Sequence, residues 1–361
     1  MTTLEKQIDD KIGEVRTDAL DLSYGEIANL HSNEELVIDP DYQRLFRWTN
    51  EQRSRFIESI LIELPIPQIF VIENDDGVYE LIDGLQRVSS VLQFLNPTSI
   101  SEDELTLEGC GIIEGLNGKT FSNLPLSLKL RIKRSSLRAI VIKKQSKSFL
   151  RYEMFKRLNT GGALLSPQEI RNCSARMIGS VGISFYALLQ ELAVYPNFKS
   201  TTATLAQSDL DQKGDEELVL RFLATKNAAD MFKGSVRDWL TDYMEEVILE
   251  RRQFNYENER ADFEKTFDLI SQKLGETAFV KFRGKSPIGG LAPAYYEGIA
   301  VGFYKARDII VEQSTEKVKD TIVSLVQSSD FREVTGPGAN ARTKFRKRIS
   351  LVEEALRAAC S

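Results

Sequence analysis

The sequence predicts an α+β fold, with a mixed N-terminal domain over residues 15–145 and an all-α domain over residues 146–361. Short apolar strands alternate with helical patterns in the first part of the chain. From Ser148 onward, apolar residues recur at helical spacing. A chain of 361 residues, 42% of them hydrophobic, is long enough to bury the cores of two domains.

The first domain begins with a short apolar stretch, Leu36–Ile38, followed by an extended segment. A helix comes next, with apolar residues at helical spacing over 56–64 until Pro65 stops it. Two apolar segments within 66–82 then flank an acidic turn that ends in Gly77, which is the pattern of a β-hairpin. The acidic turn is interpreted as the tip of this hairpin and not as a metal site.

The second domain is expected to be a series of helices. Its best-marked helix start is Ser166-Pro167-Gln168-Glu169, where a hydroxyl caps the helix, proline takes the first helical position and a carboxylate bonds back to the cap. The preceding Gly161 and Gly162 either cap the previous helix or expose N–H groups to an anion. The helical patterns cover Ser148–Leu158, Pro167–Cys173, Ile183–Leu192, Glu216–Thr225, Val236–Arg252, Asn258–Leu274, Ala292–Glu312, Glu316–Gln327 and Ala341–Ala358.

Composition limits the classes of function. The formal net charge of −6 argues against a generic basic nucleic-acid coat. The chain has no apolar run of about 18 residues and no signal-peptide core, so we expect a cytoplasmic protein without a membrane partner. Three widely separated cysteines, Cys110, Cys173 and Cys360, predict reduced thiols and no structural metal site.

The single histidine, His31, excludes several catalytic sites by number alone. Neither a histidine metal pair, nor a His-Asn-His nuclease, nor a two-histidine phosphoesterase can be built from one imidazole. His31 could still act as a lone base. Its neighbourhood has the composition of a loop, which favours a structural or neutral role.

Two segments concentrate positive charge. Residues 129–157 contain eleven Lys or Arg and one acid, Glu153, so Lys133 and Arg134 are candidates for contact with nucleic acid. A glycine-rich turn near residue 338 opens a basic helix whose candidates are Lys344, Arg346 and Lys347. In both segments a solvated surface is the alternative interpretation. For the last helix, that alternative turns Phe345, Ile349, Val352 and Leu356 inward.

The sequence Asp83-Gly84-Leu85-Gln86-Arg87 follows a predicted strand and opens a helix. Glycine permits the tight turn, and the free N–H groups and dipole of the new helix favour phosphate. Arg87 can grip two phosphate oxygens, Gln86 can hydrogen-bond beside it, and Asp83 can hold a magnesium-bound water. Asp83 and Arg87 are therefore the catalytic candidates, although an ordinary helix cap and a surface cation would give the same residues. Glu58 is the other nearby acid, but spacing does not make it a general base.

Four ordered motifs give the N-terminal part a family resemblance: Pro40–Trp48, Arg55–Pro67, the DGLQR sequence and Arg157–Arg171. They resemble the DGQQR family, the N-terminal domain of GmrSD-type modification-dependent restriction enzymes. The resemblance covers roughly residues 15–175. It implies a ParB/sulfiredoxin-like fold whose DGQQR turn binds, and in some members hydrolyses, a nucleoside triphosphate with Mg²⁺ during defence against foreign or modified DNA.

Residue by residue, the resemblance implies a nucleotide site in one cleft. Leu85 departs from the usual first glutamine of the motif, which leaves only its backbone N–H for phosphate. The related enzymes commonly carry a His-Asn-His nuclease, which one histidine cannot supply. The candidates for nucleotide binding are Gly84, Gln86 and Arg87 of the turn, Tyr42, Gln43 and Arg44 upstream, and Asn159, Gly161, Gly162 and Arg171 downstream.

Three functions are compatible with these residues. The first is a component of a bacterial DNA-defence system that binds and hydrolyses a nucleoside triphosphate. The second is a DNA-binding adaptor that uses the same cleft without turnover. The third is an antitoxin-like partner of a separate effector. DNA is an expected partner in the first two, and the sequence leaves a separate nuclease and an oligomer open.

Overall fold

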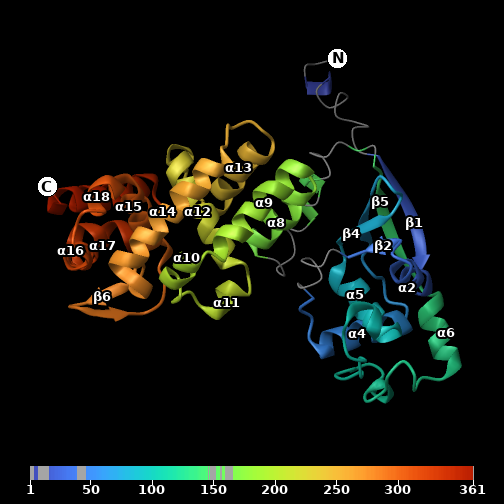
Figure 1. The fold of residues 1–361 in the computed structure, drawn as a ribbon. Coiled ribbons are helices and arrows are strands. Elements are labelled where there is room, and N and C mark those ends of the chain that lie inside the picture. Colours follow the sequence, from blue (N-terminus) through green and yellow to red (C-terminus); the bar gives the residue numbers. More distant parts are fainter. Residues whose placement is uncertain are drawn as a thin grey trace. The chain divides into compact units, whose positions relative to one another are not determined.

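The computed structural model describes residues 4–6, 16–38, 46–144, 146, 152–154, 157–158 and 166–360 (Figure 1). The chain divides into two compact units, residues 1–165 and 166–361. The first unit holds a mixed five-stranded sheet with helices, and the second is largely helical. The predicted α+β class is therefore confirmed.

The sheet of the first unit has the strand order β1-β5-β3-β4-β2. The central strand β3 pairs in parallel with β5 and antiparallel with β4, so the sheet is mixed. Along β5, Leu137, Ala139 and Val141 are buried while Ser136 and Arg138 are exposed, the alternation expected of a strand with one covered face. The strands are β1 (Thr17–Ser23), β2 (Leu36–Val37), β3 (Ile69–Glu73), β4 (Tyr79–Asp83) and β5 (Ser136–Ile142).

Four helices form a layer beside this sheet: α2 (Tyr24–Ser32), α4 (Asn50–Leu61), α5 (Leu85–Leu95) and α6 (Leu126–Arg134) (Figure 1). Each contributes a fully buried aliphatic side chain, namely Ile27, Ile57, Val91 and Ile132. The predicted hairpin is present as β3 and β4, and Gly77 in its turn has a φ of 81°. The remaining turns are the 3-10 helices η1 (Pro97–Ile100) and η2 (Glu114–Leu116).

Helix α4 holds the long connection between α5 and α6. The Oγ atom of Ser54 accepts the N–H of Glu108 at 3.0 Å. The Oε1 atom of Glu58 accepts the N–H groups of Ile112 at 2.9 Å and Ile113 at 2.6 Å. Glu58 is only 4% exposed, so this acid anchors a loop and is not placed for proton transfer with a ligand.

The second unit is built of helices and one small hairpin. The hairpin of β6 (Lys281–Arg283) and β7 (Ser286–Ile288) was not predicted, because strands of three residues are too short to show a period of two. The predicted helix Ser148–Leu158 lies largely outside the described residues. The helices are α8 (Pro167–Arg176), α9 (Ser180–Ala193), α10 (Pro196–Thr201), α11 (Gln207–Leu210), α12 (Gly214–Ala228), α13 (Val236–Ile248), α14 (Tyr256–Leu274), α15 (Pro293–Ile310), α16 (Thr315–Gln327), α17 (Ser329–Thr335) and α18 (Arg342–Cys360), with η3 (Ala229–Met231) and η4 (Gly275–Thr277).

Phenylalanines fill the centre of the second unit. The ring of Phe222 on α12 lies edge-on to Phe263 and Phe267 of α14, with centroid separations of 5.3 and 5.6 Å. Phe198 of α10 contacts the same two rings. Aromatic edge-to-face pairs add to the free energy of burying their area. None of the described helices has the length and apolar character to cross a membrane.

A chain of ion pairs runs through the same unit. Arg171 of α8 donates to Glu217 of α12 at 2.6 Å, and Glu217 also accepts from Arg221 at 2.9 Å. Arg221 reaches Glu297 of α15 at 2.7 Å, and Glu297 pairs with Arg348 of α18. The side chains of Glu297 and Arg348 are 1% and 0% exposed. Four helices are therefore joined by charges that have little access to water.

We predict that Glu297→Gln lowers the free energy of unfolding by about 3–5 kcal/mol, because it leaves the buried guanidinium of Arg348 without a carboxylate and leaves Arg221 with Glu217 alone. The matched control is Glu191→Gln on α9. Glu191 pairs with Arg260 at 2.8 Å, but its side chain is 51% exposed, so its loss should cost less than about 1 kcal/mol. Urea denaturation followed by circular dichroism measures both. Equal costs for the two variants would contradict the prediction.

Candidate functional site

The DGLQR sequence forms a tight turn between a strand and a helix. Asp83 is the last residue of β4, and Gly84 is the N-cap of α5 with φ 98° and ψ 16°. This left-handed conformation is the one that glycine adopts without strain. A Cβ atom at Gly84 would also lie 2.3 Å from the Cγ2 atom of Ile69 on β3. Both the dihedral angle and the close packing therefore require glycine here.

Asp83 and Arg87 are brought together by this turn. The Nη2 atom of Arg87 donates to the Oδ2 atom of Asp83 at 2.8 Å. The side chains are 17% and 27% exposed, so both remain accessible at the edge of the domain. An anionic ligand at Arg87 would have to share the guanidinium with Asp83 or replace it.

The side chain of Gln86 is buried and contacts the backbone, which is not the position that ligand binding would require. Its Oε1 atom accepts the backbone N–H groups of Arg47 and Trp48, both at 3.0 Å, and the residue is 8% exposed. The carboxamide thus fixes the end of the upstream motif against the start of α5. We interpret Gln86 as a positioning residue for this segment.

Arg53 of α4 also contacts the segment that contains Arg47 and Trp48. Its Nε atom donates to the carbonyl of Trp48 at 2.8 Å, and its guanidinium lies 4.0 Å from the ring centroid of Phe46. The ring of Trp48 contacts Phe56 edge-on, as expected for a structural role of these two aromatics. Thr49 then starts α4 with a capping box that includes Gln52.

Two buried side chains, those of Leu85 and Tyr24, lie at the turn. Leu85, which replaces the usual glutamine of the motif, is buried at 4% exposure and packs into the core. Tyr24 of α2 is buried, and its hydroxyl has no hydrogen-bond partner among the described residues. Burial raises the pKa of Tyr24, which the nearby charge of Arg87 opposes. The phenol is therefore neutral near the cation of the turn.

Other predicted site residues fall elsewhere. Tyr42, Gln43, Arg44, Asn159, Gly161 and Gly162 lie outside the described residues. Arg171 lies in the second unit, where it is 2% exposed and bound to Glu217 and Gln168. The predicted capping box of Ser166 and Glu169 is present at the start of the same helix. The guanidinium of Arg171 thus has a structural role within the second unit.

Four of the eight described cations in the basic segment 129–157 have carboxylate partners. Arg138 donates two hydrogen bonds to Asp21, both at 2.9 Å, and Lys143 pairs with Asp18 at 3.0 Å. Lys133 lies 5.6 Å from the ring centroid of Phe121. Arg134 is exposed and has no ion pair with a described residue. Of the predicted polyanion face, Lys129, Lys133, Arg134 and Lys144 have no ion pair with a described residue.

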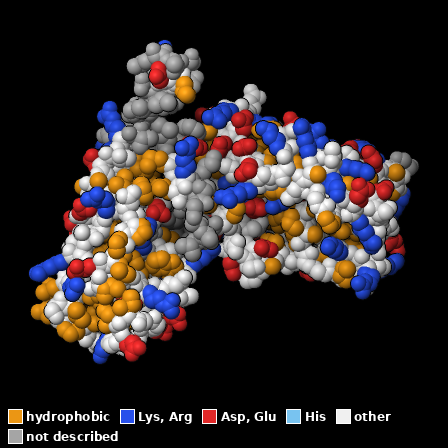
Figure 2. All heavy atoms as spheres, turned by 180° about the vertical axis from the view of Figure 1, so that it is seen from behind, with side chains coloured by type: hydrophobic (Ala, Val, Ile, Leu, Met, Phe, Trp, Pro, Cys, Tyr) orange, Lys and Arg blue, Asp and Glu red, His pale blue; other side chains and the backbone are white. Residues whose placement is uncertain are grey.

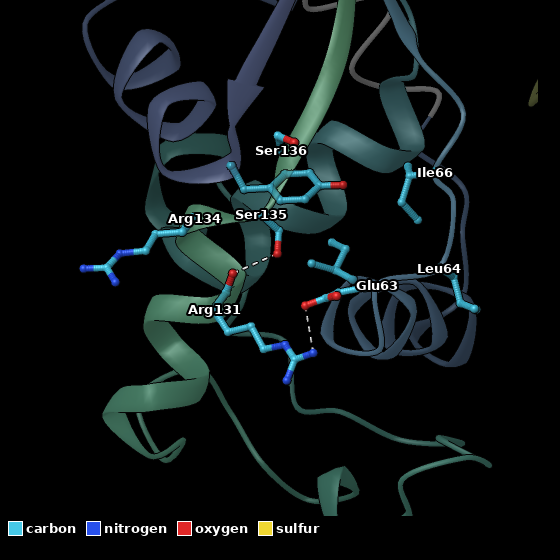
Figure 3. Close-up of a pocket in the computed structure, with 9 residues that line it drawn as sticks. Glu63, Leu64, Ile66, Arg131, Arg134, Ser135 and Ser136 are labelled. Atoms are coloured by element: carbon cyan, nitrogen blue, oxygen red, sulfur yellow. Dashed lines mark hydrogen bonds and ion pairs between the residues drawn. The ribbon is translucent and has the colours of Figure 1, made fainter.

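A cavity of about 460 Å³ lies beside the end of α6 (Figure 3). Arg131 reaches Glu63 across it at 2.9 Å, whereas Arg134 points away from both. Hydrophobic side chains gather on the first unit in Figure 2, and Leu64 of this cavity is 46% exposed. Asp83 and Arg87 are absent from the lining of this cavity, which consists of Tyr24, Ile60, Glu63, Leu64, Ile66, Arg131, Arg134, Ser135 and Ser136.

Most of the cations at the start of α18 donate hydrogen bonds to other parts of the second unit. Lys344 donates to the carbonyl of Pro337 at 3.0 Å, and Arg346 to that of Asp230 at 3.3 Å. Arg348, which directly follows Lys347 in the sequence, points inward to Glu297 because it shares the face of Phe345 and Val352. Lys347 is exposed. The predicted inward positions of Phe345, Ile349, Val352 and Leu356 are all buried.

His31 lies in the last turn of α2 and not in the loop that the composition of its neighbourhood indicates, because the helix continues to Ser32. The Nδ1 atom of His31 is buried without a hydrogen-bond partner, and burial lowers the pKa of its imidazole. No group of three or more His, Cys, Asp or Glu side chains able to hold a metal ion occurs among the described residues. Burial, followed by the charge of Glu58, raises the pKa of the Cys110 thiol, so this thiol is not activated.

Two contributors to the site were not identified from the sequence, Tyr24 and Arg53. Tyr24 stands far from the motif in the chain and carries no local signal. Arg53 carries a weak one, because it stands three and four residues before the apolar Phe56 and Ile57 and so lies on the apolar side of the helix. In the structure its guanidinium donates to Gln93 at 2.9 Å. A charged residue on the apolar side of a helix indicates a buried polar partner.

Residues 26–175 match the family model described as GmrSD restriction endonuclease, N-terminal domain. The matched segment contains the DGLQR turn and the upstream segment that Gln86 holds. No curated protein matches the chain. A solved Pnob8-like ParB-N domain is similar to it, with 13% sequence identity, coverage of 94% of this chain and 100% of that chain, and a TM-score of 0.26. A likeness at this TM-score carries no further argument.

We predict that Gly84→Ala destabilises the protein more than Gly77→Ala does. Both glycines have positive φ, 98° and 81°, so each variant carries about 1–3 kcal/mol of backbone strain. Only Gly84 has a neighbour, Ile69, in the space of the new methyl group, which adds about 1–3 kcal/mol. Thermal melting of the two variants tests this difference. Equal melting temperatures would show that the contact with Ile69 relaxes freely.

We also predict that stability contributed by neutral His31 is lost on acidification. The folded-state pKa is lowered, so the unfolded chain binds the proton more tightly. The contribution is complete above the unfolded value of about 6.5 and decreases as pH falls below it. Urea midpoints at pH 7.5 and 5.5 should therefore differ less in His31→Gln, which has no histidine, than in the natural chain. The same pH dependence in both proteins would assign it to carboxyl groups.

Proposed function

Because residues 26–175 form a GmrSD-like N-terminal domain, we propose that the chain is a nucleoside-triphosphate-binding and hydrolysing component of a restriction-like DNA-defence system. The observation that carries this proposal is the Gly84 turn, which sets the Asp83 carboxylate and the Arg87 guanidinium 2.8 Å apart at the start of a helix. A helix start with an adjacent arginine is suited to phosphate.

The chemistry assigned to the turn is an exchange of partners. A triphosphate offers Arg87 two oxygens in place of the Asp83 carboxylate, while Mg²⁺ is typically held by one or two carboxylates, phosphate oxygens and water. Asp83 would then hold a magnesium-bound water instead of Arg87. The start of α5 has no side-chain cap, so its N–H groups would be available to the same phosphates. Gln86 contributes by fixing residues 47 and 48 beside the turn.

DNA is the proposed second partner. Arg134 on α6 and Lys347 on α18 are exposed cations, one from each basic segment, and neither has an ion pair with a described residue. These 361 residues contain one histidine, so a two-histidine nuclease cannot be assembled from them alone. Cleavage of DNA in such a system would belong to a separate effector protein.

One observation favours a second function, a DNA-binding adaptor without turnover. Asp83 already neutralises Arg87, and Leu85 is buried where the family motif has glutamine. Such a turn could bind phosphate weakly and leave it intact. The adaptor would bind duplex DNA in a salt-dependent manner without releasing phosphate.

We predict that the chain releases phosphate from a nucleoside triphosphate in the presence of Mg²⁺, and that Arg87→Ala lowers the rate by about 10²–10³-fold, the loss typical of one transition-state donor. Each of the common ribonucleoside triphosphates is tested with and without duplex DNA. The matched control is Arg138→Ala, because Arg138 also pairs with an aspartate, Asp21, at 2.9 Å but lies on β5. Its rate should equal that of the natural chain.

Asp83→Asn separates the two proposed roles of the pair. It frees Arg87 from its carboxylate, so nucleotide binding without Mg²⁺ should become tighter while phosphate release is lost. Calorimetric titration measures the first effect and a phosphate assay the second. Phosphate release by Arg87→Ala at the natural rate would refute the assignment of this turn. Nucleotide binding without any release would favour the adaptor.

A further inference from the structure

The β6–β7 hairpin of the second unit is a separate candidate for an interaction surface (Figure 1). Arg283 is paired with Ser286, so the loop consists of Gly284 and Lys285. Gly284 has a φ of 59°, and a Cβ atom there would meet no atom within 4 Å. The end of the hairpin is thus open to solvent.

Two contacts hold the hairpin in a defined position. The side chain of Gln327 on α16 accepts the N–H of Gly284 at 2.9 Å and donates to its carbonyl at 3.0 Å. Phe282 is 8% exposed and packs inward from β6. The Gln327 carboxamide therefore fixes the loop of the hairpin, and the buried ring of Phe282 fixes strand β6.

The charge on this hairpin is of one sign. Lys281, Arg283 and Lys285 are exposed, and none has an ion pair with a described residue. Residues 277–296 contain these cations and no Asp or Glu, within a chain of net charge −6. Elsewhere in the same unit, exposed or half-buried cations such as Arg260 and Arg307 do have carboxylate partners. The hairpin is distinguished by carrying three cations next to one another with no acidic residue in 277–296.

The geometry suits a regularly charged partner. Lys281 and Arg283 are two residues apart on a strand, so their side chains leave the same face at a spacing of about 7 Å, while Phe282 faces the other way. Lys285 extends the charge to the loop. Ser286 adds an exposed hydroxyl, and the space beside Gly289 is open, since a Cβ atom there would meet no atom within 4 Å. Hydroxyl and backbone N–H groups are donors commonly directed at phosphates.

We propose that the β6–β7 hairpin binds the phosphate backbone of duplex DNA. A two-stranded ribbon has the dimensions that the major groove admits. Duplex DNA carries one negative charge per about 1.7 Å of its axis, a density that can engage all three cations at once. An acidic protein segment would need carboxylates placed to match the three side chains. The contacts are to phosphate, so the binding is independent of sequence.

This inference does not depend on nucleotide hydrolysis at the DGLQR turn. The test uses the triple variant Lys281→Gln, Arg283→Gln and Lys285→Gln, and fluorescence anisotropy with a labelled duplex of about 20 base pairs over a KCl series. The control is Lys199→Gln, Lys265→Gln and Lys319→Gln, which removes three charges from exposed positions of the same unit. Both variants have the same net charge.

We predict that the slope of log K against log salt becomes shallower by about 3 in the hairpin variant, close to one per lost phosphate contact. Affinity should fall at least about tenfold at moderate salt, and the control variant should keep the natural slope. Gln327→Ala keeps all three cations but frees the loop, so it should weaken binding with little change in slope. Melting temperatures check that each variant is folded.

Three outcomes would overturn the proposal. The hairpin and control variants could lose affinity equally, which would indicate an effect of net charge. The natural chain could bind an RNA hairpin or poly-glutamate but not the duplex, which would identify another partner. It could also bind none of these probes. Phosphate release is measured in parallel, and its failure with intact DNA binding would refute only the nucleotide assignment.

Discussion

The arrangement of the first unit depends on the two hydrogen bonds that the Gln86 side chain accepts from Arg47 and Trp48. They hold the upstream segment at the start of α5, directly after the glycine whose left-handed backbone lets β4 turn into that helix. Thr49 follows this segment and begins α4 with its capping box. Helix α4 then holds the long connection to α6 through Ser54 and Glu58. Loss of one carboxamide would therefore disturb the turn, α4 and the connection together.

In both units, many arginine side chains form ion pairs with carboxylates. Buried guanidinium groups such as Arg171 and Arg348 have carboxylate partners, because an isolated charge in the interior costs several kcal/mol. Surface pairs such as Arg138 with Asp21 neutralise part of a segment that is strongly basic in the sequence. A count of Lys and Arg therefore overestimates the available positive charge. Cations without a described acidic partner, such as those of the β6–β7 hairpin and Arg134, are the better guide to an anionic partner.

The sequence predicts those features that depend on neighbouring residues. Apolar periodicity predicts the β3–β4 hairpin and the buried face of α18, and the Ser166 cap and the Gly84 turn follow from local backbone chemistry. It does not predict contacts between distant segments. Gln86 meets its backbone partners across 38 and 39 positions, and Arg348 meets Glu297 across 51. For that reason an arginine of the basic run proves to be buried, and Gln86, a candidate ligand, proves to hold the backbone.

The two proposed anion sites differ in one respect that makes them separable. Arg87 is already neutralised by Asp83, so a phosphate gains there only the difference between two ion pairs, and Mg²⁺ assists by occupying the carboxylate. The hairpin cations have no such competitor, and phosphate contacts there release counterions from DNA. Added Mg²⁺ should favour the first interaction and weaken the second, because a divalent cation competes for DNA phosphates. Magnesium and salt dependence therefore distinguish a nucleotide bound at the turn from DNA bound at the hairpin.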